Sequence, residues 1–209
     1  MKTIEERNNL DSFLQLINHN KEEILKDDWI NKENWLDFIR GMANGGYDSL
    51  LDVGCHDCSI TKEFKIPSKT GVDAFDKIAD EASKHCSFKL MDARDISKNF
   101  EPKSFDVVCE LDFIEHLEKI EEADKLMDDM ESIAKKLVIH LCPANVIESE
   151  NFASTAYGDM EGFTVETGHE FNSLQHHLLQ PTKEYFTDKG YEVRLYGGDL
   201  KKIIAWKYL

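Results

Sequence analysis

The sequence predicts one α/β domain built on a doubly wound, mostly parallel sheet, and three observations support this prediction. From residue 49 to the C-terminus, short apolar segments alternate with helical patterns. Segments in the middle of the chain, such as FDVVCEL and KLVIHL, are continuously apolar, as in parallel strands that are covered on both faces. The length of 209 residues suits one well-buried domain better than two. Strands and helices in alternation indicate the doubly wound architecture.

Seven strands are expected in this sheet. They cover residues 50–53, 70–73, 88–91, 105–110, 137–142, 191–195 and 202–206. Helical patterns lie between some of them, at residues 76–84, 119–135 and 182–188. The last two strands flank Gly197, Gly198 and Asp199 with no space for a crossover helix, so we expect them to be antiparallel. Residues 1–46 are expected to form a helical cover on a sheet domain of residues 47–209.

The charge of the chain argues against several classes of partner. It carries 41 acidic and 25 basic residues, for a formal net charge of −16, without a dense cluster of lysine and arginine. Such a surface repels nucleic acid and anionic membranes, so neither is expected as a partner. The first thirty residues lack the apolar block of a secretory signal, and no apolar segment approaches the roughly 20 residues of a membrane helix. We expect a cytoplasmic protein.

Two of the five cysteines, Cys55 and Cys58, form a Cys-x-x-C motif in the segment LLDVGCHDCSI. Thioredoxin-like redox centres place this motif between a strand and a helix, but they also need a proline facing the dithiol. A zinc site needs a second ligand pair nearby, and a c-type haem needs a histidine where Ser59 stands. We therefore expect reduced, mostly buried thiols without a chemical role.

Acidic residues stand at the expected carboxyl ends of the first three strands. Asp52 and Gly54 follow the first strand, Asp73 ends the second and Asp92 follows the third. Ligands of open α/β sheets bind at this edge. Asp73 comes nineteen residues after Gly54, the spacing at which an acidic side chain binds the two hydroxyls of a ribose. We therefore expect a ligand with a ribose at this edge.

Five segments, LLDVGC, GVDAFD, FKLMDARDI, SFDVVCELDFIEHLEK and KKLVIHLCPAN, together resemble the class I S-adenosylmethionine-dependent methyltransferases in order and spacing. The resemblance extends from residue 49 to the C-terminus. It implies the strand order 3-2-1-4-5-7-6 with the last pair antiparallel, and S-adenosylmethionine as cofactor. It also implies that the cofactor is bound by Asp52, Gly54, His56, Asp73, Ala74, Asp92, Ala93, Glu110 and Leu111.

The first loop departs from the family pattern. His56 and Cys58 stand where the family has glycines, which allow a sharp turn and close approach of the cofactor. Histidine is enriched among non-glycine residues at positive φ, so the turn can form. The helix after the loop is also expected to be short. Two interpretations stay open, namely a working enzyme and a methyltransferase-like binding or regulatory domain that has lost turnover.

A second group of candidate residues lies in the segment DFIEH. On a helix, Asp112, Glu115 and His116 would share one face. A subset of the family, to which the resemblance is weaker, binds a divalent metal through an acid-x-x-Glu-His set and a later histidine. That resemblance implies Mg²⁺, Mn²⁺ or Zn²⁺ bound by Asp112, Glu115, His116 and His177. The alternative is that Glu115 and His116 only orient the local backbone.

The expected reaction is methyl transfer to a hydroxyl, or less readily an amine, of a small molecule. His116 or His177, with or without a metal, is expected to help remove the proton of the acceptor. His140 is expected to be a core or pocket-wall histidine. The sequence offers four further candidates for the general base and favours none of them over the others: Tyr157, His169, Glu170 and His176. The N-terminal helices and residues 145–175 are expected to cover the substrate, and a homodimer is among the expected assemblies.

Overall fold

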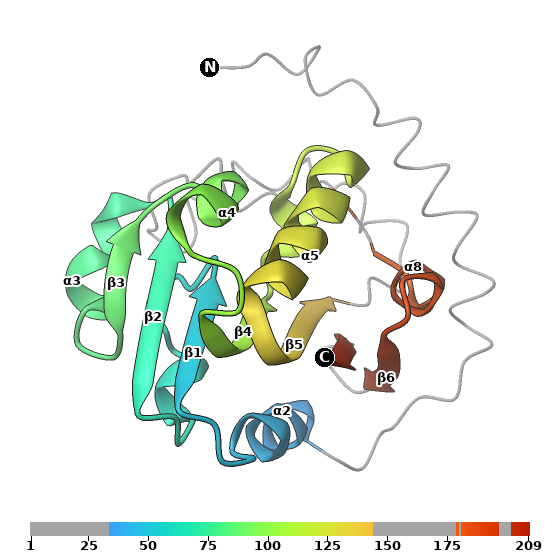
Figure 1. Ribbon diagram of the computed structural model, residues 1–209, viewed down its shortest axis with the longest axis horizontal. Coiled ribbons are helices and arrows are strands. Elements are labelled where there is room, and N and C mark those ends of the chain that lie inside the picture. Colours follow the sequence, from blue (N-terminus) through green and yellow to red (C-terminus); the bar gives the residue numbers. More distant parts are fainter. Residues whose placement is uncertain (1–33, 144–178, 180, 197–201) are drawn as a thin grey trace, which may run out of the picture.

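A computed structural model describes residues 34–143, 179, 181–196 and 202–209 of the chain. The strands are β1 (Ser49–Val53), β2 (Ser68–Asp73), β3 (Ser87–Leu90), β4 (Phe105–Leu111), β5 (Ala134–Pro143), β6 (Glu192–Tyr196) and β7 (Lys202–Tyr208). They form one seven-stranded sheet in the order β3-β2-β1-β4-β5-β7-β6 (Figure 1). β1 to β5 are parallel to one another, whereas β7 is antiparallel to both β5 and β6. The predicted fold class and strand order are therefore confirmed.

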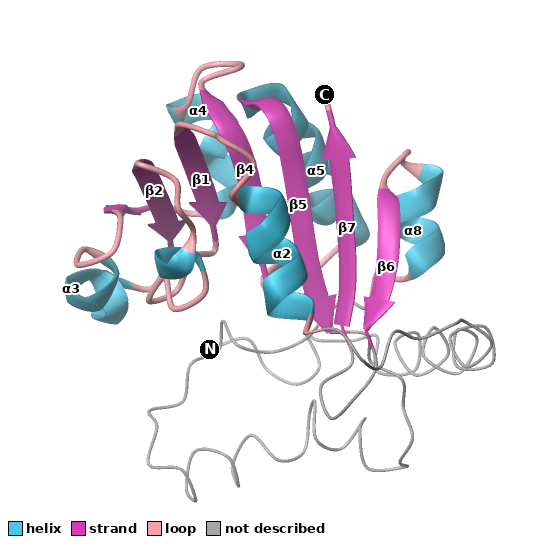
Figure 2. Cartoon of the chain, turned by 90° about the horizontal axis from the view of Figure 1, so that it is seen from below, coloured by secondary structure: helices cyan, strands magenta, loops and turns pink. Residues whose placement is uncertain are grey.

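Helices cover both faces of the sheet (Figure 2). The α-helices are α2 (Trp35–Ala43), α3 (Ala79–Ala82), α4 (Ile96–Asn99), α5 (Ile120–Ile133) and α8 (Lys183–Asp188). One core cluster joins α4, α5 and α8 to one face of the sheet, and a second joins α2 and residues 64–66 to the other. The continuously apolar strands are thus buried on both faces, as their sequences indicate.

The two longest helices that the structure describes show the apolar periodicity and the N-terminal capping expected of α-helices. α5 buries Ala123, Leu126, Met127 and Met130, which recur at the three- and four-residue spacing of one helix face. α2 begins after Asn34, whose side chain accepts a hydrogen bond of 2.9 Å from the backbone N–H of Leu36. Both helices therefore lie where the sequence places apolar residues in helical periodicity.

Several shorter elements differ from the expected ones. The structure has single 3₁₀ turns at η2 (Thr61–Glu63), η3 (Asp76–Ile78), η4 (Ala93–Asp95) and η5 (Ile114–His116). The helix after β1 is reduced to the η2 turn, in line with the expected short helix. The helical segment predicted over 76–84 forms as η3 followed directly by α3, and it ends two residues earlier than expected. The segment DFIEH does not form the helix on which Asp112, Glu115 and His116 would share one face, because only the short η5 turn forms there.

Some predictions fall outside the described residues. Of the N-terminal cover, the structure describes only α2, and residues 1–33 are outside. The turn at 197–199 and the proposed covering segment 145–175 are also outside. The domain boundary at residue 46 therefore stays a prediction. Within the described part of the chain, no helix is long and apolar enough to cross a bilayer.

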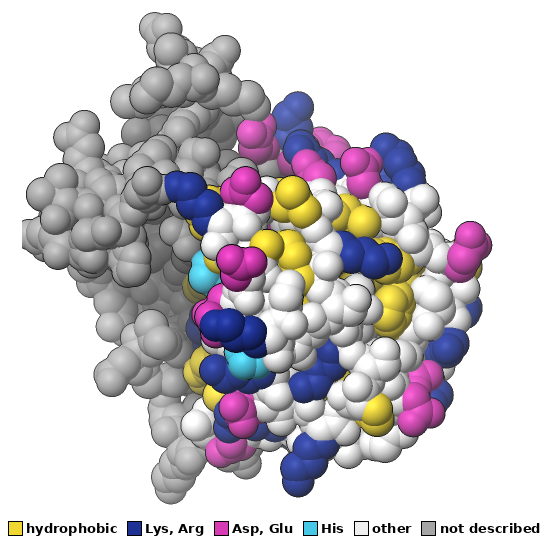
Figure 3. Space-filling model, turned by 90° about the vertical axis from the view of Figure 1, so that its left-hand side faces the viewer, with side chains coloured by type: hydrophobic (Ala, Val, Ile, Leu, Met, Phe, Trp, Pro, Cys, Tyr) yellow, Lys and Arg dark blue, Asp and Glu magenta, His cyan; other side chains and the backbone are white. Residues whose placement is uncertain are grey.

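The surface that carries α3 and β3 mixes charges of both signs. Figure 3 shows acidic and basic side chains interspersed there, with small hydrophobic areas between them. This face of the described residues has no continuous basic region of the kind that binds a phosphate backbone. The expectation against nucleic acid remains a prediction from net charge.

Candidate functional site

A cavity of about 380 Å³ lies at the carboxyl ends of β1 to β4, the edge at which open α/β sheets bind ligands. Eight of the nine residues predicted to bind a cofactor line it, from the tips of four strands. These are Asp52, Gly54, His56, Asp73, Ala74, Asp92, Ala93 and Leu111. The topology thus brings together residues that are distant in sequence, as the motifs predicted.

The loop after β1 makes its sharp turn without the usual glycines. His56 has φ 46° and Cys58 has φ 59°, both in the left-handed region that glycine normally supplies. Gly54 also has positive φ, and a Cβ atom there would lie 2.2 Å from Cδ2 of Phe113. Both the backbone conformation and the packing therefore require glycine at residue 54. His56 and Cys58, in contrast, adopt the left-handed conformation with a side chain present.

Asp73 at the end of β2 anchors this loop. Its Oδ2 accepts a hydrogen bond of 2.9 Å from the backbone N–H of His56, and its Oδ1 accepts one of 2.9 Å from the N–H of Phe75. The carboxylate is therefore fixed in orientation at the rim of the cavity. A carboxylate in a fixed orientation is suited to bind the hydroxyls of a ribose.

Asp52 is a buried carboxyl in the wall of the cavity. Its Oδ2 accepts a hydrogen bond of 2.7 Å from Oγ1 of Thr61. Burial raises the pKa of Asp52 to about 7, although hydrogen bonds from Thr61 and Cys109 oppose that rise. A cation bound beside this carboxyl would favour its ionised form.

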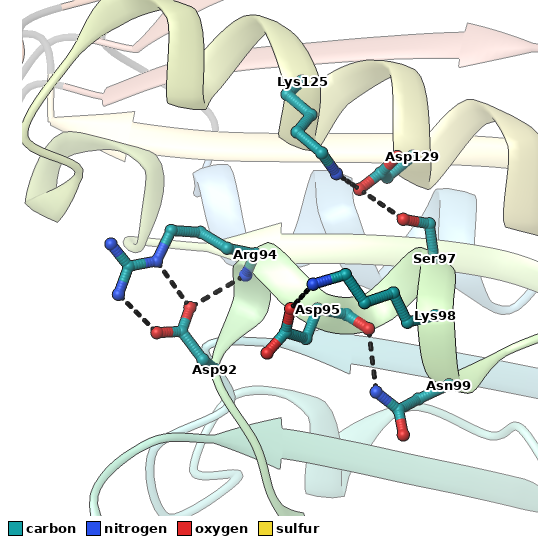
Figure 4. A network of polar contacts seen from close by, with 8 residues as sticks. All are labelled: Asp92, Arg94, Asp95, Ser97, Lys98, Asn99, Lys125 and Asp129. Atoms are coloured by element: carbon teal, nitrogen blue, oxygen red, sulfur yellow. Dashed lines mark hydrogen bonds and ion pairs between the residues drawn. The ribbon is translucent and has the colours of Figure 1, made fainter.

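Asp92 forms an ion pair with Arg94 at the other end of the cavity (Figure 4). Oδ1 of Asp92 accepts hydrogen bonds of 2.9 Å from both the backbone N–H and the Nε–H of Arg94. The guanidinium, through these hydrogen bonds, holds the pKa of Asp92 below its usual range. Nη1 of Arg94 also lies 3.4 Å from Glu122. Asp92 is thus ionised and already paired at the predicted adenine end of the site.

Glu110 does not line the cavity, unlike the other predicted cofactor residues. It is fully buried on the opposite face of β4, where Oε2 accepts the backbone N–H groups of Phe113 and Ile114 at 3.2 and 3.1 Å. Oε1 lies 3.0 Å from Nδ1 of His140. Burial raises the pKa of Glu110 and lowers the pKa of His140 to about 3, so the pair is uncharged. In this position Glu110 supports η5.

His140 is a core histidine, which agrees with the sequence analysis. It is fully buried, and its ring packs against Phe186 and Tyr191 at centroid distances of 5.5 and 5.0 Å. This position gives it no access to a substrate in the cavity.

Within the described residues, the predicted metal ligands come together only in part, since Oε1 of Glu115 lies 4.0 Å from Nε2 of His116. Asp112 has φ 60° and pairs with the ammonium of Lys202, and Glu115 is a buried residue of η5. The described groups whose ligand atoms lie close enough to share a metal ion do not include Asp112, Glu115 or His116. His177 lies outside the described residues. The structure therefore gives no support to a divalent metal at this set. His116 itself lines the cavity.

Sequence reasoning missed three residues that shape the site. Phe113 packs on Gly54, Arg94 pairs with Asp92, and Thr61 binds the buried Asp52. Arg94 is only two residues from Asp92 in the sequence, so this ion pair could have been predicted. The other two contacts depend on the positions of the β1 loop and η5, which the sequence pattern does not specify.

Comparisons with known proteins agree with this architecture. Residues 51–139 match the family model of the methyltransferase domain. A methyltransferase dependent on S-adenosylmethionine from Archaeoglobus fulgidus is 16% identical and has a TM-score of 0.55, with 82% of this chain and 94% of that chain covered. The N-methyltransferase NodS from Bradyrhizobium japonicum WM9, solved with S-adenosyl-L-homocysteine, is 14% identical with a TM-score of 0.55, covering 92% and 97%.

A third solved structure, the magnesium protoporphyrin IX methyltransferase ChlM from Synechocystis PCC 6803 with S-adenosylhomocysteine, is 15% identical with a TM-score of 0.57, covering 95% and 96%. At these identities the likeness to solved structures concerns the fold. No curated protein matches the sequence at a significant level. Residues 51–139 thus match the methyltransferase domain family, and the sheet order gives the chain the fold of the class I S-adenosylmethionine-dependent methyltransferases.

Proposed function

We propose that the chain transfers the methyl group of S-adenosylmethionine to a hydroxyl group of a small molecule, with an amine as the less favoured acceptor. The observation that carries the proposal is the convergence of eight predicted cofactor residues on one cavity of about 380 Å³. That volume lies within the range of roughly 300–1,000 Å³ typical of small-molecule sites.

The charges of the cavity suit this cofactor. Its lining includes Asp52, Asp73, Asp112 and Glu122, opposed by Arg94. S-adenosylmethionine supplies a methyl group on a cationic sulfonium and also carries an ammonium group. A lining with more carboxylates than cations favours such a ligand. In this proposal Asp73 binds the ribose, Asp92 the adenine amino group and Asp52 the methionine end.

His116 is the described residue best placed to receive the proton of an acceptor. It lines the cavity with its side chain 17% exposed. In this reaction the bond from the methyl carbon to sulfur breaks while a bond to the acceptor oxygen forms, and the hydroxyl proton leaves to a base. Alignment of the two reactants provides most of the rate, and the base assists.

Two contacts support a second candidate function, a methyltransferase-like binding domain without turnover. The ring of Phe113 lies directly over Gly54, and the guanidinium of Arg94 is paired with Asp92. Both side chains take space or hydrogen-bonding capacity that a bound cofactor would use. The two candidates differ in whether the cofactor binds and whether its methyl group is transferred.

Calorimetry with S-adenosylmethionine and with S-adenosylhomocysteine distinguishes them. The proposal predicts saturable binding of one molecule per chain for both compounds. A chain that binds neither compound, with and without added Mg²⁺, Mn²⁺ or Zn²⁺, would contradict the enzyme interpretation. Binding of both without methyl transfer would favour the second candidate.

The class of acceptor requires a separate measurement. The chain is incubated with methyl-labelled S-adenosylmethionine and a low-molecular-mass cell extract, and the labelled product is fractionated. A methyl ether is stable to base and does not bind a cation exchanger, whereas a methylamine binds the exchanger. We expect the ether. A His116→Ala variant should retain cofactor affinity and lose most of the label transfer, and label recovered mainly as methylamine would overturn the hydroxyl assignment.

A further inference from the structure

Three cysteine thiols converge at the loop after β1. Cys55 and Cys58 belong to the loop after β1, and Cys86 immediately precedes β3. Their Sγ atoms all lie within 4.8 Å of one another. In the part of the chain that the structure describes, this is the one group of three or more His, Cys, Asp or Glu whose ligand atoms meet in this way. The methyl-transfer chemistry proposed above uses none of these thiols.

The surrounding backbone leaves space for the three sulfur atoms. At Gly71 in β2, a Cβ atom would lie 2.7 Å from Sγ of Cys55 and 2.8 Å from Sγ of Cys86. Any side chain at Gly71 would therefore displace two of the thiols. Cys58 holds its sulfur toward the group with a left-handed φ of 59°. The cluster therefore depends on the absence of a side chain at Gly71 in β2 and on the left-handed conformation of Cys58 in the loop.

The three thiols are unbonded and close enough together to share one ion. Sγ of Cys58 lies 2.9 Å from Sγ of Cys86, longer than a disulfide bond of about 2.05 Å. Thiolates that share a zinc ion sit about 2.3 Å from it, so tetrahedral geometry separates them by roughly 3.8 Å. The Cys58–Cys86 separation is shorter than this value, and no pair of the three Sγ atoms is more than 4.8 Å apart. All five cysteines of the chain are free.

We propose that Cys55, Cys58 and Cys86 bind a zinc ion through three thiolates, with water at the fourth position. Three soft sulfur ligands select zinc over hard cations such as Mg²⁺, and Cys-x-x-C is an ordinary zinc-ligand spacing. Cys55 and Cys58 are buried, while Cys86 is half-buried and leaves a side of the group accessible. Zinc binding displaces the thiol protons to solvent.

A bound zinc ion would cross-link the loop after β1 to the start of β3. His56, between the two loop cysteines, already donates its backbone N–H to Asp73 of β2. Zinc would fix the same loop to a second neighbouring strand. In this loop, His56 and Cys58 hold left-handed backbone conformations that glycine adopts more readily, and the ion would hold the turn in place.

The test uses the full chain, reduced and stripped of metal with a chelator. We expect calorimetry with zinc alone to give one ion per chain. Cobalt(II), used as a spectroscopic substitute, should give the near-ultraviolet thiolate-to-cobalt charge-transfer absorption. Cys86→Ala should lower zinc affinity by at least about a hundredfold and remove most of this absorption. Cys142→Ala, which removes a buried thiol outside the cluster, is the matched control and should retain both signals.

Three results would overturn the proposal. The first is a reduced wild-type chain that takes up no stoichiometric zinc. The second is unchanged zinc affinity in both Cys86→Ala and Cys58→Ala, with metal-free thermal unfolding verifying that the variants fold. The third is a chain that does not bind zinc when reduced and forms a Cys58–Cys86 disulfide on oxidation, which peptide mapping detects. Each readout is independent of methyl transfer, so its outcome does not depend on the proposed function.

Discussion

The backbone N–H of His56 donates a hydrogen bond of 2.9 Å to Oδ2 of Asp73, which joins the loop after β1 to the tip of β2. Two sequence features that are seventeen residues apart thus form one unit. The glycine-poor loop is ordered by the same carboxylate that is predicted to bind the cofactor ribose. Changes in the loop and changes at Asp73 should therefore affect cofactor binding together.

Gly54 should tolerate a side chain less well than Gly46. Both glycines have positive φ, at +71° and +82°, but an added Cβ meets Phe113 at 2.2 Å at Gly54 and nothing within 4 Å at Gly46. Gly46→Ala should lower the free energy of unfolding by about 1–2 kcal/mol through backbone strain. Gly54→Ala should lower it by roughly 1–3 kcal/mol more because of overpacking.

Urea unfolding of the two glycine variants measures this difference. A Gly54→Ala/Phe113→Ala double variant should recover part of the loss, because the clash is with that ring. Equal losses for Gly54→Ala and Gly46→Ala would show that Phe113 does not pack on Gly54 as described.

Asp52→Asn should change the pH dependence of stability. The pKa of Asp52 is about 7 in the folded chain because of burial, against 3.8 for the exposed group. Between these values the folded chain keeps the proton and the unfolded chain does not, so the contribution of Asp52 to stability falls as pH rises. Asparagine cannot ionise and retains an acceptor for Thr61.

The free energy of unfolding of Asp52→Asn relative to wild type should therefore increase by on the order of 3 kcal/mol from about pH 5 to about pH 8. Denaturant titrations of both proteins at several pH values provide the measurement. A difference that stays constant over this interval would mean that Asp52 titrates normally.

Arg94 and Asp92 should have opposite effects on cofactor binding. Their side chains are 57% and 39% exposed, so Arg94→Ala should change stability by less than about 1 kcal/mol. Without the guanidinium, Asp92 is free to accept the adenine amino group, so S-adenosylhomocysteine should bind more tightly. Asp92→Ala should weaken binding about tenfold.

Lys98→Ala is the matched control for this pair, since Lys98 pairs with the neighbouring Asp95 outside the cavity (Figure 4). It should leave the affinity for S-adenosylhomocysteine unchanged in calorimetry. If Arg94→Ala and Asp92→Ala weakened binding to the same extent, the pair would act as a unit that supports the site.

Glu110→Gln should retain the affinity for S-adenosylhomocysteine, since Glu110 faces away from the cavity. The carboxyl is uncharged beside His140, and glutamine can accept the N–H groups of Phe113 and Ile114 in the same way. Glu110→Ala leaves those groups unpaired and should lower stability by about 2–5 kcal/mol. Thermal unfolding and calorimetry check both results, and a large loss of affinity with normal stability in Glu110→Gln would restore the predicted cofactor role.

The sheet was predictable because each strand has a recognisable pattern in the local sequence. Continuous apolar segments such as FDVVCEL mark strands buried on both faces, and acidic residues mark their carboxyl ends. The orientation of Glu110 was not predictable, because neighbouring strand residues face opposite sides and Leu111, not Glu110, reaches the cavity. Eight of the nine predicted cofactor residues lie at strand tips or in the following turns, where their position depends less on register.

Local backbone geometry was harder to predict than topology. DFIEH has helical spacing, but Asp112 has positive φ and Glu110 binds the N–H groups of the next turn, so only η5 forms. The third thiol of the cysteine cluster was also missed. Cys86 is 28 residues from Cys58, and only the pairing of β2 with β3 brings it near the loop. A single distant cysteine can complete a group of three zinc ligands, so the lack of a second ligand pair in the sequence does not exclude zinc.

The central claim is that the cavity at the strand tips binds the cofactor with Asp73 at its ribose. Calorimetry with S-adenosylhomocysteine on wild type, Asp73→Ala and Asp80→Ala tests it most directly, since Asp80 is an exposed acidic residue of α3 outside the cavity. We predict binding of one molecule per chain for wild type and Asp80→Ala, and a loss of about a hundredfold or more for Asp73→Ala. Wild-type affinity in Asp73→Ala, or no binding by the wild-type chain, would contradict the claim.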